Sequence, residues 1–413
     1  MTKSDKGIEK MERVFIVGAK RTAIGSFQGA LSSVSAAELG AEVTKSVLEQ
    51  AQVSGKSVDE VIFGNALPAG QGQGVARQIS IHANIPSSIP ASGVNMVCGS
   101  GLKSVMNGYA SIAAGLNNVV LAGGVESMSQ APHLLPPKIR NGIKMGGFEV
   151  EDHMLKDGLT DAFSHEHMGV TAENIADKYS ISREEQDAFA YESQQKAIKA
   201  QDAGAFKEEI VPITVKSRYG EEVVDADEYI NRSTSLEKLA KLRPVFKKDG
   251  TVTAGNASGL NDGASAVLIV SESYLKAHDL EPLAEIVSIG QGGVNPDIMG
   301  MGPVSAIEEA LRRVDLSLSD MDVIELNEAF AAQSIGVVNE LARNTGVDAA
   351  DIYEKTNING GAIALGHPIG ASGNRVLVTL LHLMKKRESQ YGLASLCIGG
   401  GMGVSMILKK SKL

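Results

Sequence analysis

Short apolar runs alternate with segments of helical periodicity at the start of the chain. The run Val14–Val17 predicts a buried strand that ends at Gly18. A second strand is predicted over Val58–Asn65. Between them, apolar residues recur at helical spacing at Ala36, Leu39, Gly40, Val43, Val47 and Leu48. Because strands that are apolar on both faces are typical of sheets covered by helices on both sides, the pattern predicts an α/β fold.

The same order of elements returns near the end of the chain. Leu283–Ile289 predicts a strand, Val304–Val314 a helix, and Ser319–Asn327 a strand that again ends at an asparagine. We therefore expect the second half of the chain to repeat the fold of the first.

Glycine-rich turns support this duplication. Cys98–Gly101 precedes a predicted helix over Leu102–Ala114, and Gly370–Gly373 precedes one over Asn374–Lys385. The strands predicted after these helices are Val119–Ala122 and Leu393–Ile398. Two matched β-α-β units indicate an internal repeat with layers of helices around parallel strands.

Composition changes between the two halves. The stretch after residue 127 holds Pro132, Pro136 and Pro137, and a polar helix whose start is marked by the capping-box residues Ser182 and Glu185. This stretch predicts an inserted loop domain that caps a cleft. The predicted organisation is an N-terminal half over 1–127 with part of 261–281, an inserted domain over 128–260, and a C-terminal half over 282–413.

Charge and cysteine content narrow the class of protein. The 413 residues carry a formal net charge of −10 without a basic block, which argues against nucleic-acid binding. The long uncharged window Ser104–Val125 contains three asparagines, so it predicts a helix and a strand rather than a membrane span. Two cysteines far apart in the chain exclude a disulfide framework and CxxC metal spacing, which fits a reducing compartment.

The two ends of the chain bear on location. The first residues, MTKSDKGIEK, lack the apolar core of a secretory signal, and we expect a cytoplasmic protein. The terminal Ser411-Lys412-Leu413 matches a peroxisomal address, which carries meaning only in a eukaryote. The peroxisome is therefore the alternative location for a eukaryotic source.

Cys98 is the first candidate for chemistry. It lies in an uncharged stretch just before a predicted helix, and the positive end of the helix dipole favours a thiolate there. Gly99 and Gly101 let a substrate carbonyl approach the backbone N–H groups. The local sequence fits a nucleophile and a small buried cysteine in a tight turn equally well.

Three more polar residues lie at comparable turns. His367 lies in a loop rich in glycine and proline, and a cysteine with a distant histidine is typical of a nucleophile with its base. Asn327 ends one predicted strand, and Cys397 ends another before Gly399–Gly401, whose N–H groups suit an oxyanion hole. Because ligands bind at this edge of covered α/β sheets, the four residues predict a single site.

Other motifs give weaker indications. Gly70–Gly74 lacks the spacing of a dinucleotide-binding fingerprint. His165 and His167 are two positions apart, so on a helix they would point away from each other and would not form a zinc site. The sequence therefore predicts neither a nucleotide fingerprint nor a metal centre.

Five motifs together resemble those of the thiolase family, and in particular its acetoacetyl-CoA thiolases. They are Asn95–Gly101, Gly123–Ser129, Asn327–Phe330, Gly366–Gly373 and Cys397–Gly403. The resemblance covers roughly residues 13–408. It implies a duplicated βαβαβαββ fold with a five-layer α-β-α-β-α core, and a homo-oligomer, expected to be a tetramer built as a dimer of dimers.

The resemblance also implies an activity, that of an acetyl-CoA C-acetyltransferase. Two acetyl-CoA molecules would form acetoacetyl-CoA and CoA, or the reverse, by ping-pong kinetics through acetyl-Cys98. His367 would activate Cys98 and then help to hold the thioester oxygen, while Cys397 would remove a proton from the second acetyl-CoA. Asn327 would position a water beside His367, and the N–H groups of Cys98 and Gly399 would form a second oxyanion hole.

The inserted domain is then implied to bind coenzyme A, as a substrate, with no metal and no tightly bound cofactor. His167 and Met168 match the pair that lines the acyl pocket of biosynthetic thiolases, where Met168 would narrow the tunnel. Arg232 is the expected basic residue near the nucleotide, one position out of the family register. Further matching positions on the pantetheine and adenine side are Leu159, Phe246, Ala254, Ser258, Ala329 and Phe330.

Three alternatives stay open on the sequence. A broad-chain degradative 3-ketoacyl-CoA thiolase would share the catalytic residues; Met168 argues against it, whereas the terminal tripeptide favours it. A condensing enzyme of the ketoacyl-synthase type would use a malonyl thioester, and Cys397 argues against that class. A non-catalytic acyl-CoA-binding protein would be expected to lack at least one of Cys98, His367 or Cys397.

Overall fold

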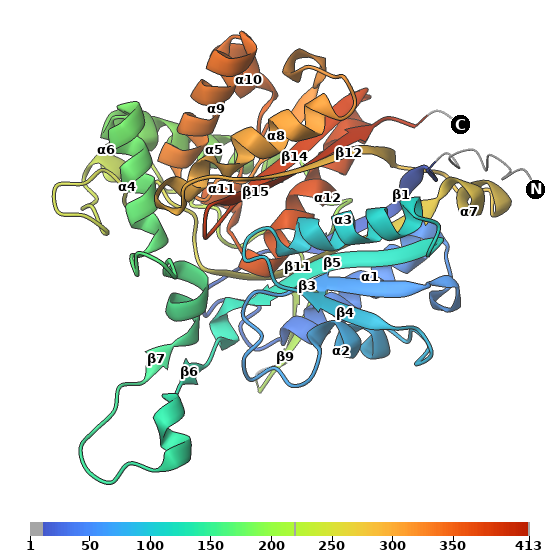
Figure 1. Ribbon diagram of the computed structural model, residues 1–413, viewed down its shortest axis with the longest axis horizontal. Helices are drawn as coiled ribbons and strands as arrows, with labels where there is room; N and C mark the ends of the chain where they lie inside the picture. The colour runs from blue at the N-terminus through green and yellow to red at the C-terminus, as the bar shows by residue number, and fades with distance from the viewer. Residues whose placement is uncertain (1–10, 219, 412–413) are drawn as a thin grey trace, which may run out of the picture.

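The computed structural model describes residues 11–218 and 220–411 (Figure 1). The predictions made from the first ten residues and from Lys412 and Leu413 lie outside these ranges. Within the described ranges, no helix is long and apolar enough to cross a membrane. The uncharged window Ser104–Val125 is a helix followed by a strand, as predicted.

The first half alternates strands and helices as the hydrophobic pattern predicts. Its first helix begins at a capping box, in which Ser35 and Glu38 each bond the backbone N–H of the other. In chain order the elements are β1 (Val14–Thr22), β2 (Gly25–Ser26), α1 (Ala36–Ala51), β3 (Glu60–Gly64), α2 (Val75–His82), β4 (Ala91–Val94), α3 (Ser100–Ala113) and β5 (Val119–Ser127). After the insertion, β11 (Asn261–Ser271) and α7 (Glu272–Ala277) complete this half.

The second half repeats this order with one reduced element. The counterpart of β4 is a single β-bridge between Ile324 and Thr356. The elements are β12 (Ala284–Gly293), α8 (Gly302–Arg312), β13 (Val323–Leu326), α9 (Ala331–Thr345), α10 (Ala349–Lys355), α11 (Ala362–Leu365), α12 (Ile369–Arg387), β14 (Tyr391–Ile398) and β15 (Met402–Lys409). The duplication is therefore confirmed, with the third strand of the repeat reduced to that bridge.

Helix α12 begins earlier than predicted. It begins at Ile369 with Pro368 as its N-cap, so Gly370–Gly373 form its first turn instead of preceding it. The glycines allow close packing between the two central helices, because a Cβ on Gly373 would lie 2.4 Å from the backbone nitrogen of Leu102. Glycine at this position thus serves helix packing rather than turn formation.

The strands join in one sheet whose two halves enclose the central helices. The order is β13-β14-β15-β12-β1-β11-β5-β3-β4, and β1 links the halves by pairing with both β11 and β12. One apolar cluster packs α1 and α2 on the N-terminal half, a second packs α3 and α12 between the halves, and a third packs α8 and α9 on the C-terminal half. These layers confirm the predicted α-β-α-β-α core.

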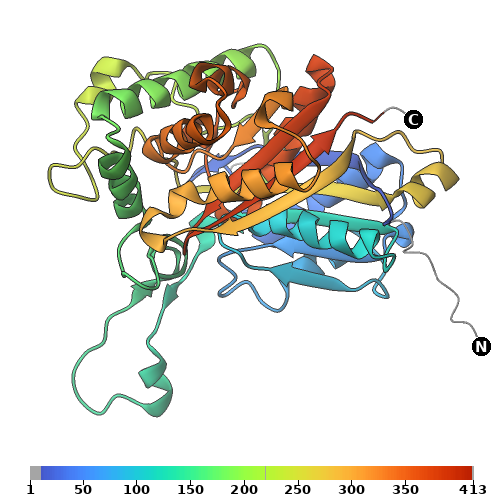
Figure 2. The same cartoon turned by 45° about the horizontal axis from the view of Figure 1, so that its top comes forward.

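The insertion lies beside the C-terminal half, where α4 (Met168–Tyr179) and α5 (Arg183–Asp202) pack against α9 (Figure 1). Its hairpin of β6 (His133–Leu134) and β7 (Glu151–Asp152) extends away from the body of the molecule in both views (Figure 2). The other elements are a π-helical turn (Met154–Leu159), α4 (Met168–Tyr179), α5 (Arg183–Asp202), β8 (Ile210–Val211), β9 (Ile213–Ser217), β10 (Gly220–Val224) and α6 (Leu236–Ala240). The predicted domain boundaries at 127, 260 and 281 stay predictions.

Candidate active site

The two halves of the duplicated fold bring Cys98 and His367 together. Cys98 lies between β4 and α3, and His367 lies in the loop before α12. His367 Nε2 is 3.4 Å from Cys98 Sγ, although the residues are 269 positions apart in the chain. The structure therefore makes the predicted nucleophile and base neighbours within hydrogen-bond reach.

The neighbours of His367 define which ring nitrogen carries the proton. The Ser372 hydroxyl donates its single proton to the carbonyl oxygen of Pro368, at 3.0 Å. Ser372 Oγ is also 2.5 Å from His367 Nδ1, so Nδ1–H donates to it. The Nε2 lone pair consequently faces the Cys98 thiol, which is the arrangement that a general base requires.

Both members of the pair are neutral at rest. Desolvation by the surrounding side chains raises the pKa of the Cys98 thiol to about 11, although backbone N–H groups of Gly399 and Cys98 favour the charged sulfur. Burial likewise lowers the pKa of His367 to about 4. Burial therefore outweighs the effect of the helix dipole, which favours a thiolate at the start of α3. A neutral Cys98 thiol has to lose its proton to become a nucleophile, and His367 Nε2 is the base within reach.

The lowered pKa of His367 predicts an acid-dependent loss of stability. The unfolded chain binds a proton near pH 6.5 and the folded chain near pH 4, so the unfolded state gains the proton first as pH falls. His367 therefore makes its full contribution to the free energy of unfolding above about pH 6.5. About 3 kcal/mol of that free energy is lost by about pH 4. Thermal unfolding from pH 8 to 4 should show a steeper fall in Tm for the wild type than for His367→Asn. Parallel Tm curves through this window would contradict the assignment.

Cys397, Gly399 and Asn327 lie at the same edge of the sheet. β13 and β14 run parallel, so their carboxyl ends lie together, with Asn327 following β13 and Cys397 near the end of β14. Cys397 is fully buried, and burial first and the nearby Cys98 second raise the pKa of its thiol. Asn327 is also fully buried, and its side-chain amide has no hydrogen-bond partner in the described part of the chain. An amide so placed can bond a small polar molecule.

A cavity of about 360 Å³ adjoins the Cys98–His367 pair, whereas Cys397 and Asn327 lie behind its lining. Cys98, His367 and Gly399 line it on the side of the two halves, and the insertion supplies most of the opposite wall. The predicted pocket residues that line it are Leu159, His167, Met168, Phe246, Ala254, Ser258, Ala329 and Phe330. Its lining is mostly apolar, as suits an acyl chain and a pantetheine arm.

His167 is part of this wall and also begins a helix. Its Nδ1 accepts the N–H of Gly169 as the N-cap of α4, at 3.0 Å, so the neutral ring carries its proton on Nε2. The ring stacks on Phe246, with centroids 4.5 Å apart. Burial lowers the pKa of His167, which keeps it neutral and available as a hydrogen-bond donor.

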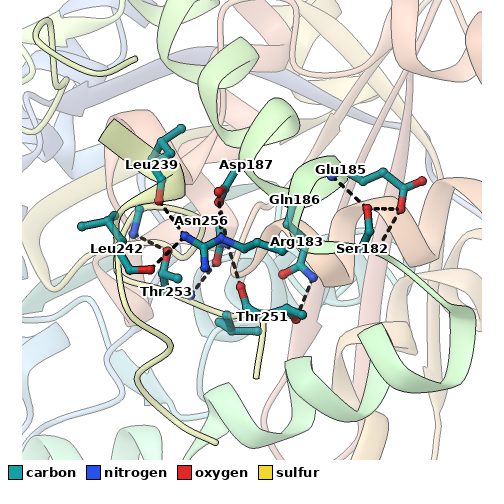
Figure 3. A network of polar contacts seen from close by, with 12 residues as sticks. Ser182, Arg183, Glu185, Gln186, Asp187, Leu239, Leu242, Thr251, Thr253 and Asn256 are labelled. Atoms are coloured by element: carbon teal, nitrogen blue, oxygen red, sulfur yellow. Dashed lines mark hydrogen bonds and ion pairs between the residues drawn. The ribbon is translucent and has the colours of Figure 1, made fainter. Parts of the chain in front are cut away.

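A polar network anchors the wall formed by residues 245–257 (Figure 3). Arg183 Nη2 donates to the carbonyl oxygens of Leu239 and Leu242, at 2.6 and 3.0 Å, and Arg183 Nε donates to Asp187. Asn256 Nδ2 donates to Asp187 Oδ1 at 3.0 Å. Helix α5 thereby holds both ends of the segment that carries Phe246 and Ala254.

The structure does not bring Arg232 to the cavity. Arg232 is exposed, and its Nη2 contacts Gln201 at 2.6 Å and forms an ion pair with Asp202 at 2.8 Å. The Arg232 guanidinium, which was expected near the nucleotide, is paired with Asp202 instead. Arg232 does not line the cavity in this conformation, and its expected role near the nucleotide stays a prediction.

The sequence did not single out several cavity residues. Met299 comes from the 3₁₀ helix Pro296–Met301 that precedes α8, and Tyr229 comes from the insertion. Neither belongs to a motif. Ser372, which contacts His367 Nδ1 but does not line the cavity, lies in the Gly366–Gly373 motif, and its position five residues after His367 was the available signal. Other lining residues without a motif are Leu155, Gly158, Val245, Ala257, Gly259 and Leu260.

Comparison with protein families identifies the class. Models of the thiolase N-terminal domain and the thiolase C-terminal domain match residues 14–273 and 280–410. The chain belongs to the thiolase family. As a thiolase it is an acyltransferase that uses coenzyme A as a substrate, so the ketoacyl-synthase and non-catalytic alternatives are set aside.

Individual relatives of this thiolase share its full length. An acetyl-CoA acetyltransferase of Chromobacterium violaceum is 54% identical, covering 96% of this chain and 99% of the relative. The structure of an acetyl-CoA acetyltransferase from Syntrophomonas wolfei is 40% identical with a TM-score of 0.94, covering 97% and 100% of the two chains. Human mitochondrial 3-ketoacyl-CoA thiolase in complex with CoA is 44% identical with a TM-score of 0.91, covering 98% and 99%. The thiolase fold predicted from the sequence is thus confirmed.

Proposed function

We propose that this thiolase is an acetyl-CoA C-acetyltransferase that forms and cleaves acetoacetyl-CoA through acetyl-Cys98. The observation that carries the proposal is the Cys98–His367 pair in the wall of an apolar cavity that Met168 also lines. The relative from Chromobacterium violaceum, which bears this activity in its name, supports the same substrate.

The first half-reaction transfers the acetyl group to the enzyme. Cys98 Sγ attacks the thioester carbon and its proton passes to His367 Nε2, which faces it at 3.4 Å. The C–S bond to CoA then breaks, and the Cys397 thiol protonates the departing CoA thiolate. The N–H groups of Cys98 and Gly399 hold the acyl oxygen of the acetyl-enzyme.

The second half-reaction forms the carbon–carbon bond. The Cys397 thiolate removes a proton from the methyl carbon of a second acetyl-CoA, while protonated His367 and a water on Asn327 stabilise the enolate oxygen. The enolate carbon attacks acetyl-Cys98, and the Cys98 thiolate leaves and regains its proton from His367. A thioester Cα–H is a weak acid, so the raised pKa of Cys397 matches the base to its task.

Thiolysis with ketoacyl-CoA substrates of increasing chain length tests the proposal. Cleavage confined to acetoacetyl-CoA, followed by loss of the ketoacyl-CoA enolate absorbance, would support it. Comparable rates on long chains would favour a broad-chain degradative 3-ketoacyl-CoA thiolase, the alternative supported by the likeness to the human enzyme. No cleavage of any ketoacyl-CoA would contradict both assignments.

Met168 is expected to limit the acyl chain length. Its side chain is buried in the cavity wall, and a Cβ on Gly399 would lie 3.4 Å from its sulfur. Met168→Ala should raise kcat/KM for 3-ketohexanoyl-CoA relative to acetoacetyl-CoA by about tenfold or more, since each methylene accommodated in a pocket is worth that order. Met106→Ala, which removes a buried methionine from α3 away from the cavity, is the control. An unchanged kcat/KM ratio in Met168→Ala would mean that residues in another part of the cavity wall limit the acyl chain length.

The proposal extends to the oligomeric state and the cellular location of the protein. We infer a homotetramer, since the projecting hairpin exposes Met145 and Phe148 and offers apolar surface for another subunit. Light scattering on the purified protein tests this, and a monomer would contradict it. The bacterial relatives support the proposed cytoplasmic location.

A further inference from the structure

Glu126 is a buried carboxylate beside the catalytic pair, and the proposed chemistry gives it no part. It lies at the end of β5 and is fully buried. Its Oε1 accepts from Asn65 Nδ2 at 2.7 Å and from the N–H of Leu67 at 3.1 Å. Its Oε2 accepts from the N–H groups of Ala66 at 2.9 Å and Gly370 at 2.8 Å. One side chain thus holds two separate loops by their backbones.

The hydrogen bond from Gly370 links Glu126 to the loop that carries His367. Gly370 lies in the first turn of α12, three residues after His367. This turn is pressed onto β5, because a Cβ on Gly370 would lie 2.5 Å from the carbonyl oxygen of Val125 and 2.8 Å from Glu126 Oε2. Glu126 therefore holds the start of α12, from which the His367 loop departs.

The hydrogen bond from Ala66 links Glu126 to the loop that carries Cys98. The Ala66 carbonyl oxygen accepts from Asn95 Nδ2 at 3.2 Å, and Asn95 Oδ1 accepts the N–H of Val97 at 3.0 Å. Val97 has a φ of 46°, in the left-handed region that β-branched residues avoid. This chain of bonds therefore restrains the strained residue that immediately precedes Cys98.

We propose that Glu126 is a positioning residue that sets the geometry of Cys98 relative to His367 by tying the nucleophile loop of one half to the histidine loop of the other. It contacts neither side chain directly and acts through Gly370 on one side and through Ala66, Asn95 and Val97 on the other. The inference rests on the proposed roles of Cys98 and His367.

Alkylation of Cys98 by iodoacetamide, followed by peptide mass spectrometry from pH 7 to 10, tests this geometry without an acyl-CoA substrate. The Sγ–C bond forms, iodide leaves, and the thiol proton goes to His367 Nε2. Because thiolate is scarce below a pKa of about 11, assistance by His367 should give the wild type a rate plateau near neutral pH. His367→Ala should remove this plateau, so that the rate rises about tenfold per pH unit.

Glu126→Gln keeps the size of the side chain but presents an NH₂ group to N–H donors, which misaligns the loops. We expect the neutral-pH rate to fall at least about tenfold, as for a displaced general base. Asp59→Asn is the matched control, since Asp59 accepts the N–H groups of Asn118 and Val119 at the opposite end of the same strand. It should retain the plateau. A folded Glu126→Gln protein with a plateau within about twofold of wild type would overturn the proposal.

Two further measurements separate the possible failures. If a Tm measurement shows that Glu126→Gln is not folded, Asn65→Ala is used instead, because it removes one hydrogen bond to the Glu126 carboxylate. An unchanged rate plateau in Asn65→Ala overturns the proposal. Thiolysis of acetoacetyl-CoA by the wild type is measured in parallel. Its absence would contradict the proposed function, whereas the plateau comparison would still decide the role of Glu126.

Discussion

Cys98→Ser is expected to abolish acyl transfer. Replacing the thiol by a hydroxyl raises the pKa of the nucleophile far beyond reach of a histidine, and the pKa of His367 is already lowered to about 4. Loss of a nucleophile that acts together with its base costs on the order of 10³-fold or more in kcat. We therefore expect no measurable thiolysis, and no acetyl adduct on the intact protein after exposure to acetyl-CoA.

The control for this result is Cys98→Ala, which has no nucleophile and should resemble the serine variant. Tm should change little for either, since the Ser100 hydroxyl holds the surrounding loop by accepting the N–H of Met96 and donating to the carbonyl oxygen of Val97. A serine variant that gained a stable acetyl mass at the wild-type rate would show that another residue is acylated.

The sequence was sufficient to single out Cys98 and His367, which the structure brings together, because each lies in a motif with turn-forming residues. The Asn95–Gly101 and Gly366–Gly373 motifs place Cys98 and His367 at helix starts, and the duplication brings such starts to one edge. The elements themselves followed from hydrophobic periodicity. Such features are local, or repeat along the chain, so a single sequence displays them.

What the sequence could not give depends on burial and on contacts between distant segments. The helix dipole that favours a thiolate at Cys98 is visible in the sequence, whereas the desolvation that raises the pKa of its thiol is not. The pairing of Arg232 with Asp202, and the four bonds to Glu126, likewise join positions with no common pattern. The roles of such polar residues can be inferred only once the structure shows their hydrogen-bond or ion-pair partners.

Cys397→Ser is expected to separate the two half-reactions. Acetylation of Cys98 from acetyl-CoA should stay within a few-fold of wild type, because a CoA thiolate leaves readily with water as the proton source. Condensation should fall on the order of 10²–10⁴-fold, the usual contribution of a positioned general base. Single-turnover acetylation followed by mass spectrometry, and steady-state condensation of acetyl-CoA, measure the two steps on one preparation.

Cys397 is fully buried within an apolar cluster that includes Met168 and Phe330, so the serine hydroxyl itself costs about 1–3 kcal/mol of stability if it finds no partner. Cys397→Ala avoids that cost and keeps the cluster apolar. Both variants should therefore acetylate at Cys98 and fail to condense, although their Tm values differ. Loss of acetylation together with condensation in both would assign Cys397 a packing role. The two sulfurs would then no longer divide the chemistry between nucleophile and base.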